Sequence, residues 1–168
     1  MAELPKILIA GMGNVLRQDD AFGIELAKAL QQEDLLSDGI KILEVGIGGI
    51  HLVQELHYGY DVLILLDAVQ WGGEPGQVYF REMASIADVE ALDRDEKRSF
   101  LGDMHYTNPI RALMMAKALN VLPPQVLILG CEALAYEDFA MEMSPVVQAA
   151  IPKAVDSLLN WLKQIEKV

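Results

Sequence analysis

Short runs of apolar residues alternate along this chain with segments in which apolar residues recur every three or four positions. The short runs are typical of buried parallel strands, and the spaced segments are typical of helices with one apolar face. We therefore expect strands at residues 6–10, 40–45, 62–67 and 126–130, and helices at residues 20–32, at 50–58, from 109 and from 144. Apolar and polar residues alternate in residues 77–82, which predicts an edge strand with one wet face.

The alternation of strands and helices predicts the fold class. It indicates an α/β protein, a three-layer α/β/α sandwich with a mostly parallel five-stranded sheet and one antiparallel edge strand. No linker, repeat or low-complexity stretch divides the chain, so we expect residues 1–168 to form one domain. The charge-dense residues 85–100 predict an exposed helix with a loop.

The amino-acid composition then disfavours several classes of function. The formal net charge is −12, from 25 acidic and 13 basic residues, which disfavours partners that bind through Lys and Arg, such as nucleic acids. No apolar run approaches the roughly 20 residues of a membrane span, and the N-terminus lacks a secretory signal. Cys131 is the only cysteine, so no intrachain disulfide can form. We expect a cytoplasmic protein that binds neither membranes nor nucleic acid.

The first predicted strand leads into a glycine-rich loop, which raises the question of a dinucleotide site. Gly11 and Gly13 fit a G-x-G-x-x-G fingerprint, but Leu16 stands where the third glycine belongs. Asp19 and Asp20 also place two carboxylates where a pyrophosphate would bind. The loop therefore disfavours an NAD-dependent oxidoreductase. For Asp19 we expect a helix cap.

Three polar residues stand out as candidates for shared chemistry. Asp20 follows the glycine-rich loop, Asp67 closes an otherwise apolar strand, and His105 lies in the loop before the helix that begins at Pro109. Each alone is compatible with an ordinary structural role. Together, two carboxylates and an imidazole offer an oxygen, oxygen and nitrogen ligand set that suits a borderline divalent metal.

The glycine-rich loop also resembles the opening motif of the hydrogenase maturation endopeptidases. That family combines a glycine-x-glycine-asparagine turn, a leucine, an acidic pair and a helix glycine at the spacing seen here: Gly11, Gly13, Asn14, Leu16, Asp19, Asp20 and Gly23. Asp67 matches the strand-end aspartate of the family and His105 its single loop histidine. Residues 46–49 match a second glycine-rich turn, although Ile47 and Gly48 replace the expected threonine-containing turn. The resemblance covers nearly the whole chain.

The resemblance implies an aspartyl-type endopeptidase, a peptide hydrolase that acts in hydrogenase maturation. Asp20, Asp67 and His105 would be both the metal-contacting and the catalytic residues. The partner would be the precursor of a nickel–iron hydrogenase large subunit, which supplies the nickel and loses a short C-terminal extension. Other divalent metals are expected to substitute for nickel in vitro, and we expect a monomer.

Other functions remain open from the sequence. A nickel-sensing or chaperone module would use the same three residues without cutting anything. A peptidyl-tRNA hydrolase predicts a basic face, which the net charge disfavours. The chain has neither a G-x-S-x-G elbow nor an H-E-x-x-H helix, which favours metal-assisted hydrolysis. We expect Cys131 to be buried, His51 and His57 to lie on a helix surface, and Met114 to pack in the core.

Overall fold

A computed structural model describes residues 3–33, 37–102 and 109–166. It contains one five-stranded sheet in the order β2-β1-β3-β5-β4. The strands are β1 (Ile7–Met12), β2 (Ile40–Gly46), β3 (Val62–Val69), β4 (Val78–Glu82) and β5 (Gln125–Glu132). The pairings among β1, β2, β3 and β5 are parallel, and β4 pairs antiparallel with β5 at the edge. The predicted sheet and its antiparallel edge strand are confirmed.

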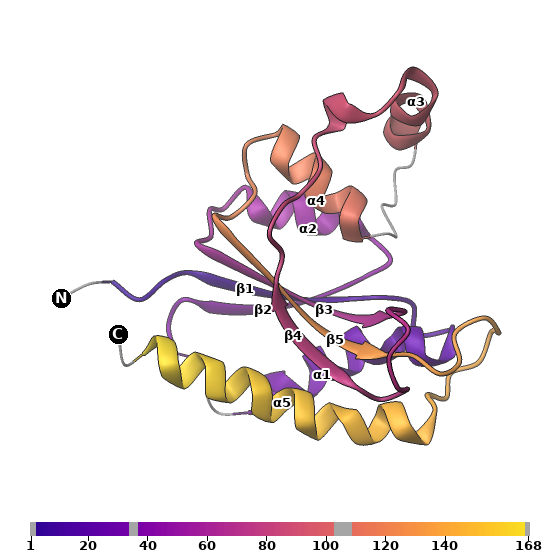
Figure 1. Cartoon of the computed structure of the whole chain (residues 1–168). Coiled ribbons are helices and arrows are strands. Elements are labelled where there is room, and N and C mark those ends of the chain that lie inside the picture. Colours follow the sequence, from indigo (N-terminus) through magenta and orange to yellow (C-terminus); the bar gives the residue numbers. More distant parts are fainter. Residues whose placement is uncertain (1–2, 34–36, 103–108, 167–168) are drawn as a thin grey trace.

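Helices cover both faces of the sheet (Figure 1). The α-helices are α1 (Phe22–Gln31), α2 (Gly49–Leu56), α3 (Arg94–Gly102), α4 (Pro109–Ala118) and α5 (Pro145–Ile165), and the 3-10 helices are η1 (Gln18–Ala21) and η2 (Val89–Ala91). One core lies between the sheet and α1 with α5, and a second lies between the sheet and α2 with α4. This is the three-layer sandwich that the sequence predicts.

The central strands form both cores because they are apolar on both faces. All six residues of β1 are buried, and so are seven of the eight residues of β3. Alternate side chains of a strand point to opposite faces, so Leu8 and Leu63 enter one core while Ile9 and Ile64 enter the other. Because the sheet is buried on both faces, the positions of its strand ends are fixed. The candidate site lies at these strand ends.

The connection order places a switch point between β1 and β3. From β1 the chain crosses to β2 on one side, and after α2 it returns to β3 on the other side of β1. In parallel α/β sheets, ligands bind outside the carboxyl ends of the strands at such a point. Both ends of the described chain lie at the opposite end of the sheet (Figure 1).

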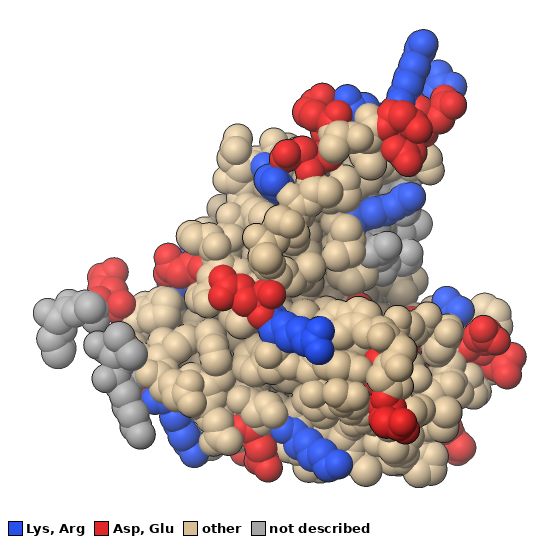
Figure 2. Space-filling model, viewed as in Figure 1, with Lys and Arg blue, Asp and Glu red and all other residues tan. Residues whose placement is uncertain are grey.

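The segment that follows β4 projects from the sandwich as far as α3 (Figure 1). This confirms the predicted exposed helix, although Phe100 is buried in the core beside α4. Acidic and basic side chains are mixed on this projection, and the described residues on the face shown in Figure 2 form no continuous basic surface. Within the described residues, no helix is both long and apolar enough to cross a membrane.

Candidate active site

Asp20 and Asp67 meet at the switch point between β1 and β3. β1 pairs with β3 only as far as Leu66, whereas β5 stays paired with β3 to Val69. Asp67 is therefore the first residue of β3 that β1 no longer covers. The 3-10 helix η1, which carries Asp20, contacts β3. The structure thus brings together two of the three predicted site residues, which are 47 positions apart in the sequence.

Two glycines allow η1 to approach the strands so closely. Gly13 has φ +115°, and a Cβ there would lie 2.0 Å from the carbonyl oxygen of Asp20. A Cβ on Gly23 would lie 2.1 Å from the carbonyl oxygen of Leu66 and 2.3 Å from that of Met12. Only residues without a Cβ fit at these positions. Gly13 and Gly23 therefore allow the backbone segments to pack closely. The ends of the strands remain free for the carboxylates of Asp20 and Asp67.

A hydrogen bond from the glycine-rich loop orients Asp20. The backbone N–H of Asn14 donates to Oδ2 of Asp20 at 3.0 Å, and Oδ1 of Asn14 accepts from the backbone N–H of Leu16 at 2.9 Å. Asp20 is half-buried, and its side chain caps neither η1 nor α1. Its second oxygen, Oδ1, accepts no hydrogen bond from the described part of the chain and is available to a ligand.

The pKa values of both carboxyl groups are raised above their ordinary values. Burial and the neighbouring charge of Asp20 raise the pKa of Asp67 to about 8, although the backbone N–H of Ala68 donates to it. Burial also raises the pKa of Asp20, an effect that the hydrogen bond from Asn14 and the charge of Arg17 oppose. Two carboxylates that repel each other at a strand end are a favourable setting for a divalent cation.

Asp19 has a different role from the one that the sequence predicts. The expectation that it caps the helix is wrong, because its fully buried carboxylate accepts hydrogen bonds from the loop before α5. The donors are the backbone N–H groups of Leu134, Ala135 and Ser144 and the hydroxyl of Ser144, at 2.6–2.9 Å. Asp19 therefore anchors a distant loop beside the site, while its neighbour Asp20 faces the strand end.

His105, the third predicted residue, lies outside the described residues. Four positions separate it in the sequence from Pro109, which begins α4. Within the described ranges, no cluster of three or more His, Cys, Asp or Glu side chains is arranged to hold a metal ion. The described part of the site supplies two carboxylates, whose oxygens fit a hard or borderline divalent cation.

A groove of about 650 Å³ opens beside Asp67. Its walls come from the end of β3, the segment after β4 and the first residues of α4: Asp67–Trp71, Arg81–Ser85, Pro109, Ile110 and Ile128. The groove is mostly apolar, with Arg81 as its basic member. An open, mostly apolar site of this kind can accept a peptide segment.

Sequence reasoning missed the buried Glu132, which holds the backbone of Trp71 in one wall of this groove. Its carboxylate accepts from the backbone N–H groups of Trp71 and Gly72 and from the hydroxyl of Tyr79, at 3.0–3.1 Å. Burial alone would raise the pKa of Glu132, but these hydrogen bonds hold it below its usual value. A charged residue directly after the apolar run of residues 126–131 was the signal that could have revealed it.

The structure confirms the expectations for Cys131, for the two histidines of the second helix and for Met114. Cys131 is fully buried, and burial with the nearby charges of Asp19 and Glu132 raises the pKa of its thiol to about 11, which leaves no reactive thiolate at neutral pH. His51 and His57 are exposed on or just after α2. Met114 is buried in the core.

Comparison with known protein families gives a consistent result. The family model described as hydrogenase maturation protease (HycI) matches residues 24–161, a range that includes Asp67 and His105 and begins just after Asp20. The hydrogenase expression/formation protein HupD of Thiocapsa roseopersicina is 30% identical over 164 residues, covering 95% of this chain and 69% of that protein. The coenzyme F420 hydrogenase subunit delta of Methanothermobacter thermautotrophicus is 29% identical, covering 92% and 93%.

Solved structures agree with this match. The hydrogenase maturating endopeptidase HybD from Escherichia coli superimposes with a TM-score of 0.73 at 25% identity, covering 95% of this chain and 93% of that one. The hydrogenase 2 maturation peptidase from Thaumarchaeota archaeon SCGC_AB-539-E09 gives a TM-score of 0.66 at 30% identity, covering 94% and 97%. The similarity therefore extends over essentially the whole fold.

Proposed function

The chain belongs to the hydrogenase maturation protease family, and from this we propose that it removes the C-terminal extension of a nickel-loaded hydrogenase large-subunit precursor. The observation that carries the proposal is the pairing of Asp20 with Asp67 at the switch point, where repulsion and burial raise the pKa of Asp67. A divalent ion bound to the precursor would stabilise both carboxylates in their ionised form. The site then binds a loaded precursor more tightly than an empty one.

We propose Asp20, Asp67 and His105 as the residues that contact the nickel of the precursor. The free Oδ1 of Asp20 and the carboxylate of Asp67 supply oxygen ligands, and His105 supplies an imidazole nitrogen. The sequence supports His105 because it lies four positions before Pro109, which lines the same groove as Asp67. In this arrangement, the nickel belongs to the substrate and not to the enzyme.

The same residues are our candidates for the hydrolysis. Nickel held between substrate and enzyme polarises a nearby carbonyl and acidifies a bound water. Burial and the charge of Asp20 favour the protonated form of Asp67 in the free protein, and a bound cation would favour its ionised form. We propose that Asp20, which the N–H of Asn14 orients, accepts a proton from the attacking water once it is released from the nickel.

The test compares one precursor in two states. The purified chain is mixed with the large-subunit precursor, once nickel-loaded and once nickel-free, and the mass of the subunit is followed. The proposal predicts loss of a short C-terminal peptide from the loaded precursor alone. Tight binding of the loaded precursor without any loss of mass would instead support a nickel-sensing module that does not cleave.

A further inference from the structure

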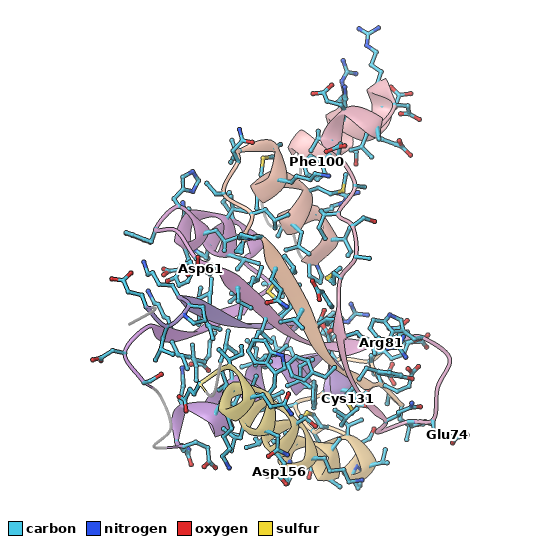
Figure 3. The ribbon with its side chains drawn as sticks, turned by 60° about the vertical axis from the view of Figure 1, so that its left-hand side comes forward. Asp61, Glu74, Arg81, Phe100, Cys131 and Asp156 are labelled. Atoms are coloured by element: carbon cyan, nitrogen blue, oxygen red, sulfur yellow. The ribbon has the colours of Figure 1, made fainter. Side chains whose placement is uncertain are left out.

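Arg81 occupies an unusual position on the wall of the Asp67 groove. Strand β4 places Tyr79 and Arg81 on the same face, two residues apart. The guanidinium carbon of Arg81 lies 4.9 Å from the centroid of the Tyr79 ring and 5.1 Å from that of the Trp71 ring. Figure 3 shows Arg81 at the end of the sheet from which the loop with Glu74 emerges. The arginine is therefore held by two aromatic faces at the groove.

Hydrogen bonds to Glu132 fix the residues that contact Arg81. The carboxylate of Glu132 accepts from the Tyr79 hydroxyl and from the backbone N–H of Trp71, so the Tyr79 ring and the backbone of Trp71 are tied to β5. The two ring centroids are 4.8 Å apart. Gly73 completes the packing, since a Cβ there would lie 1.9 Å from the Tyr79 hydroxyl oxygen. The platform is thus preorganised, which lowers the entropic cost of using Arg81 to bind a ligand.

The buried acid behind this platform does not neutralise Arg81. Glu132 is occupied by the neutral donors of Trp71, Gly72 and Tyr79. None of the ion pairs found among the described residues involves Arg81. In a chain of net charge −12, an exposed arginine in a groove with no internal carboxylate partner favours an anionic ligand.

The shape of the guanidinium selects the kind of anion. The two rings lie within cation–π distance of the guanidinium, and this interaction does not use its N–H donors, which lie in the plane of the group. A carboxylate accepts two such parallel hydrogen bonds. The first residues of α4 also line the groove, and a helix N-terminus favours negative charge nearby. A carboxylate is therefore the group that fits beside Arg81.

We propose that Arg81 is a substrate-specificity residue that binds a carboxylate of the C-terminal extension. This inference rests on the proposed function, in which the scissile bond lies near Asp67. Every C-terminal extension ends in an α-carboxylate, and acidic side chains within it offer the same chemistry. Because Asp67 and Arg81 line one groove, the extension runs from the nickel along the groove to the aromatic platform.

The experiment measures kcat and KM for the nickel-loaded precursor with Arg81→Gln, Arg81→Lys and the control Lys163→Gln. Lys163 is exposed on α5, so its replacement removes the same charge on the opposite face of the sheet. The proposal predicts that Arg81→Gln raises KM about 10-fold or more while kcat changes less than about 2-fold. Arg81→Lys retains part of the affinity, and Lys163→Gln leaves both constants unchanged.

Two altered precursors identify the carboxylate. One carries amide side chains in place of every Asp and Glu of the extension, and the other ends in a C-terminal amide. With the precursor that lacks the carboxylate bound by Arg81, Arg81→Gln and the unaltered chain should have the same KM. An unchanged KM for Arg81→Gln overturns the inference, and so does a rise in KM that persists in full with both altered precursors. In either case, cleavage by the unaltered chain still upholds the proposed function. Failure of the unaltered chain to cleave overturns both.

Discussion

The carboxylate of Asp20 lies near enough to that of Asp67 for their repulsion to raise the pKa of Asp67. Burial is the larger cause of the rise, so the two effects can be separated by changing one residue. In Asp20→Asn, the amide oxygen still accepts from Asn14 while the charge is gone. We predict that the pKa of Asp67 then falls below 8 but stays above 3.8. Carbon-13 NMR titration of the Asp67 carboxyl measures this, and an unchanged value would disprove the coupling.

The raised pKa of Asp67 also predicts how stability depends on pH. Between about pH 4 and 8, the folded protein holds a proton on Asp67 that the unfolded chain has released. Stability is therefore lost as pH rises through this window. Asp67→Asn removes the effect, so its free energy of unfolding should exceed that of the unaltered chain by an amount that grows to a few kcal/mol at pH 8 (on the order of 1.4 kcal/mol per pKa unit).

Urea unfolding of Asp67→Asn and of the unaltered chain at pH 4, 6 and 8 checks this prediction. At pH 4 the two should be nearly equal. A variant that is equally stable or less stable at pH 8 would show that Asp67 is not a strained carboxyl. Gain of stability with loss of activity is the pattern expected of a residue that is retained for function.

Replacing Asp19 should lower the stability of the protein much more than replacing Asp20. Asp19→Ala leaves the N–H groups of Leu134, Ala135 and Ser144 without their acceptor, so it should lower the free energy of unfolding by about 3 kcal/mol or more. Asp20→Ala should cost less than about 1 kcal/mol, because its carboxyl accepts from Asn14 alone and is destabilised by burial. Chemical denaturation of both variants gives the comparison, and equal losses would contradict it.

Gly23 should tolerate no side chain. A Cβ at this position meets the carbonyl oxygens of Leu66 and Met12, which are backbone atoms of β3 and β1 and cannot rotate away. We predict that Gly23→Ala lowers the free energy of unfolding by about 2–4 kcal/mol and reduces activity by moving Asp20 away from Asp67. Lys28→Ala, an exposed change in the same helix, is the control and should cost less than about 0.5 kcal/mol.

The fold was predictable because its signals are local. The apolar run of residues 62–66 specifies a strand buried on both faces, and the charge that follows it identifies the strand end. Asp67 could therefore be singled out before any contact was known. The short strand at residues 77–82 was likewise readable as an edge strand from its alternation, although Tyr79 packs on one core and Phe80 on the other, so neither face is wholly wet.

The parts of the site that were missed depend on contacts between distant segments. Asp19 looks like a cap from its neighbours, but its partner Ser144 is 125 positions away. Glu132 and Arg81 are ordinary charged residues in the sequence, and their roles appear only when β4 and β5 pair and bring Trp71 against them. Gly23 indicates that two backbones approach closely, but the sequence does not show that these belong to η1 and β3.

The most direct test of the central claim is cleavage of the nickel-loaded precursor by Asp67→Ala, followed by mass spectrometry beside the unaltered chain and Asp156→Ala. Asp156 is exposed on α5, so its replacement removes a carboxylate far from the groove (Figure 3). We predict that Asp67→Ala stays folded, as judged by thermal unfolding, and cleaves at least about 1,000-fold more slowly. Asp20→Ala and His105→Ala should behave alike, and Asp156→Ala should retain full activity. A folded Asp67→Ala that still removes the extension at the normal rate would contradict the account.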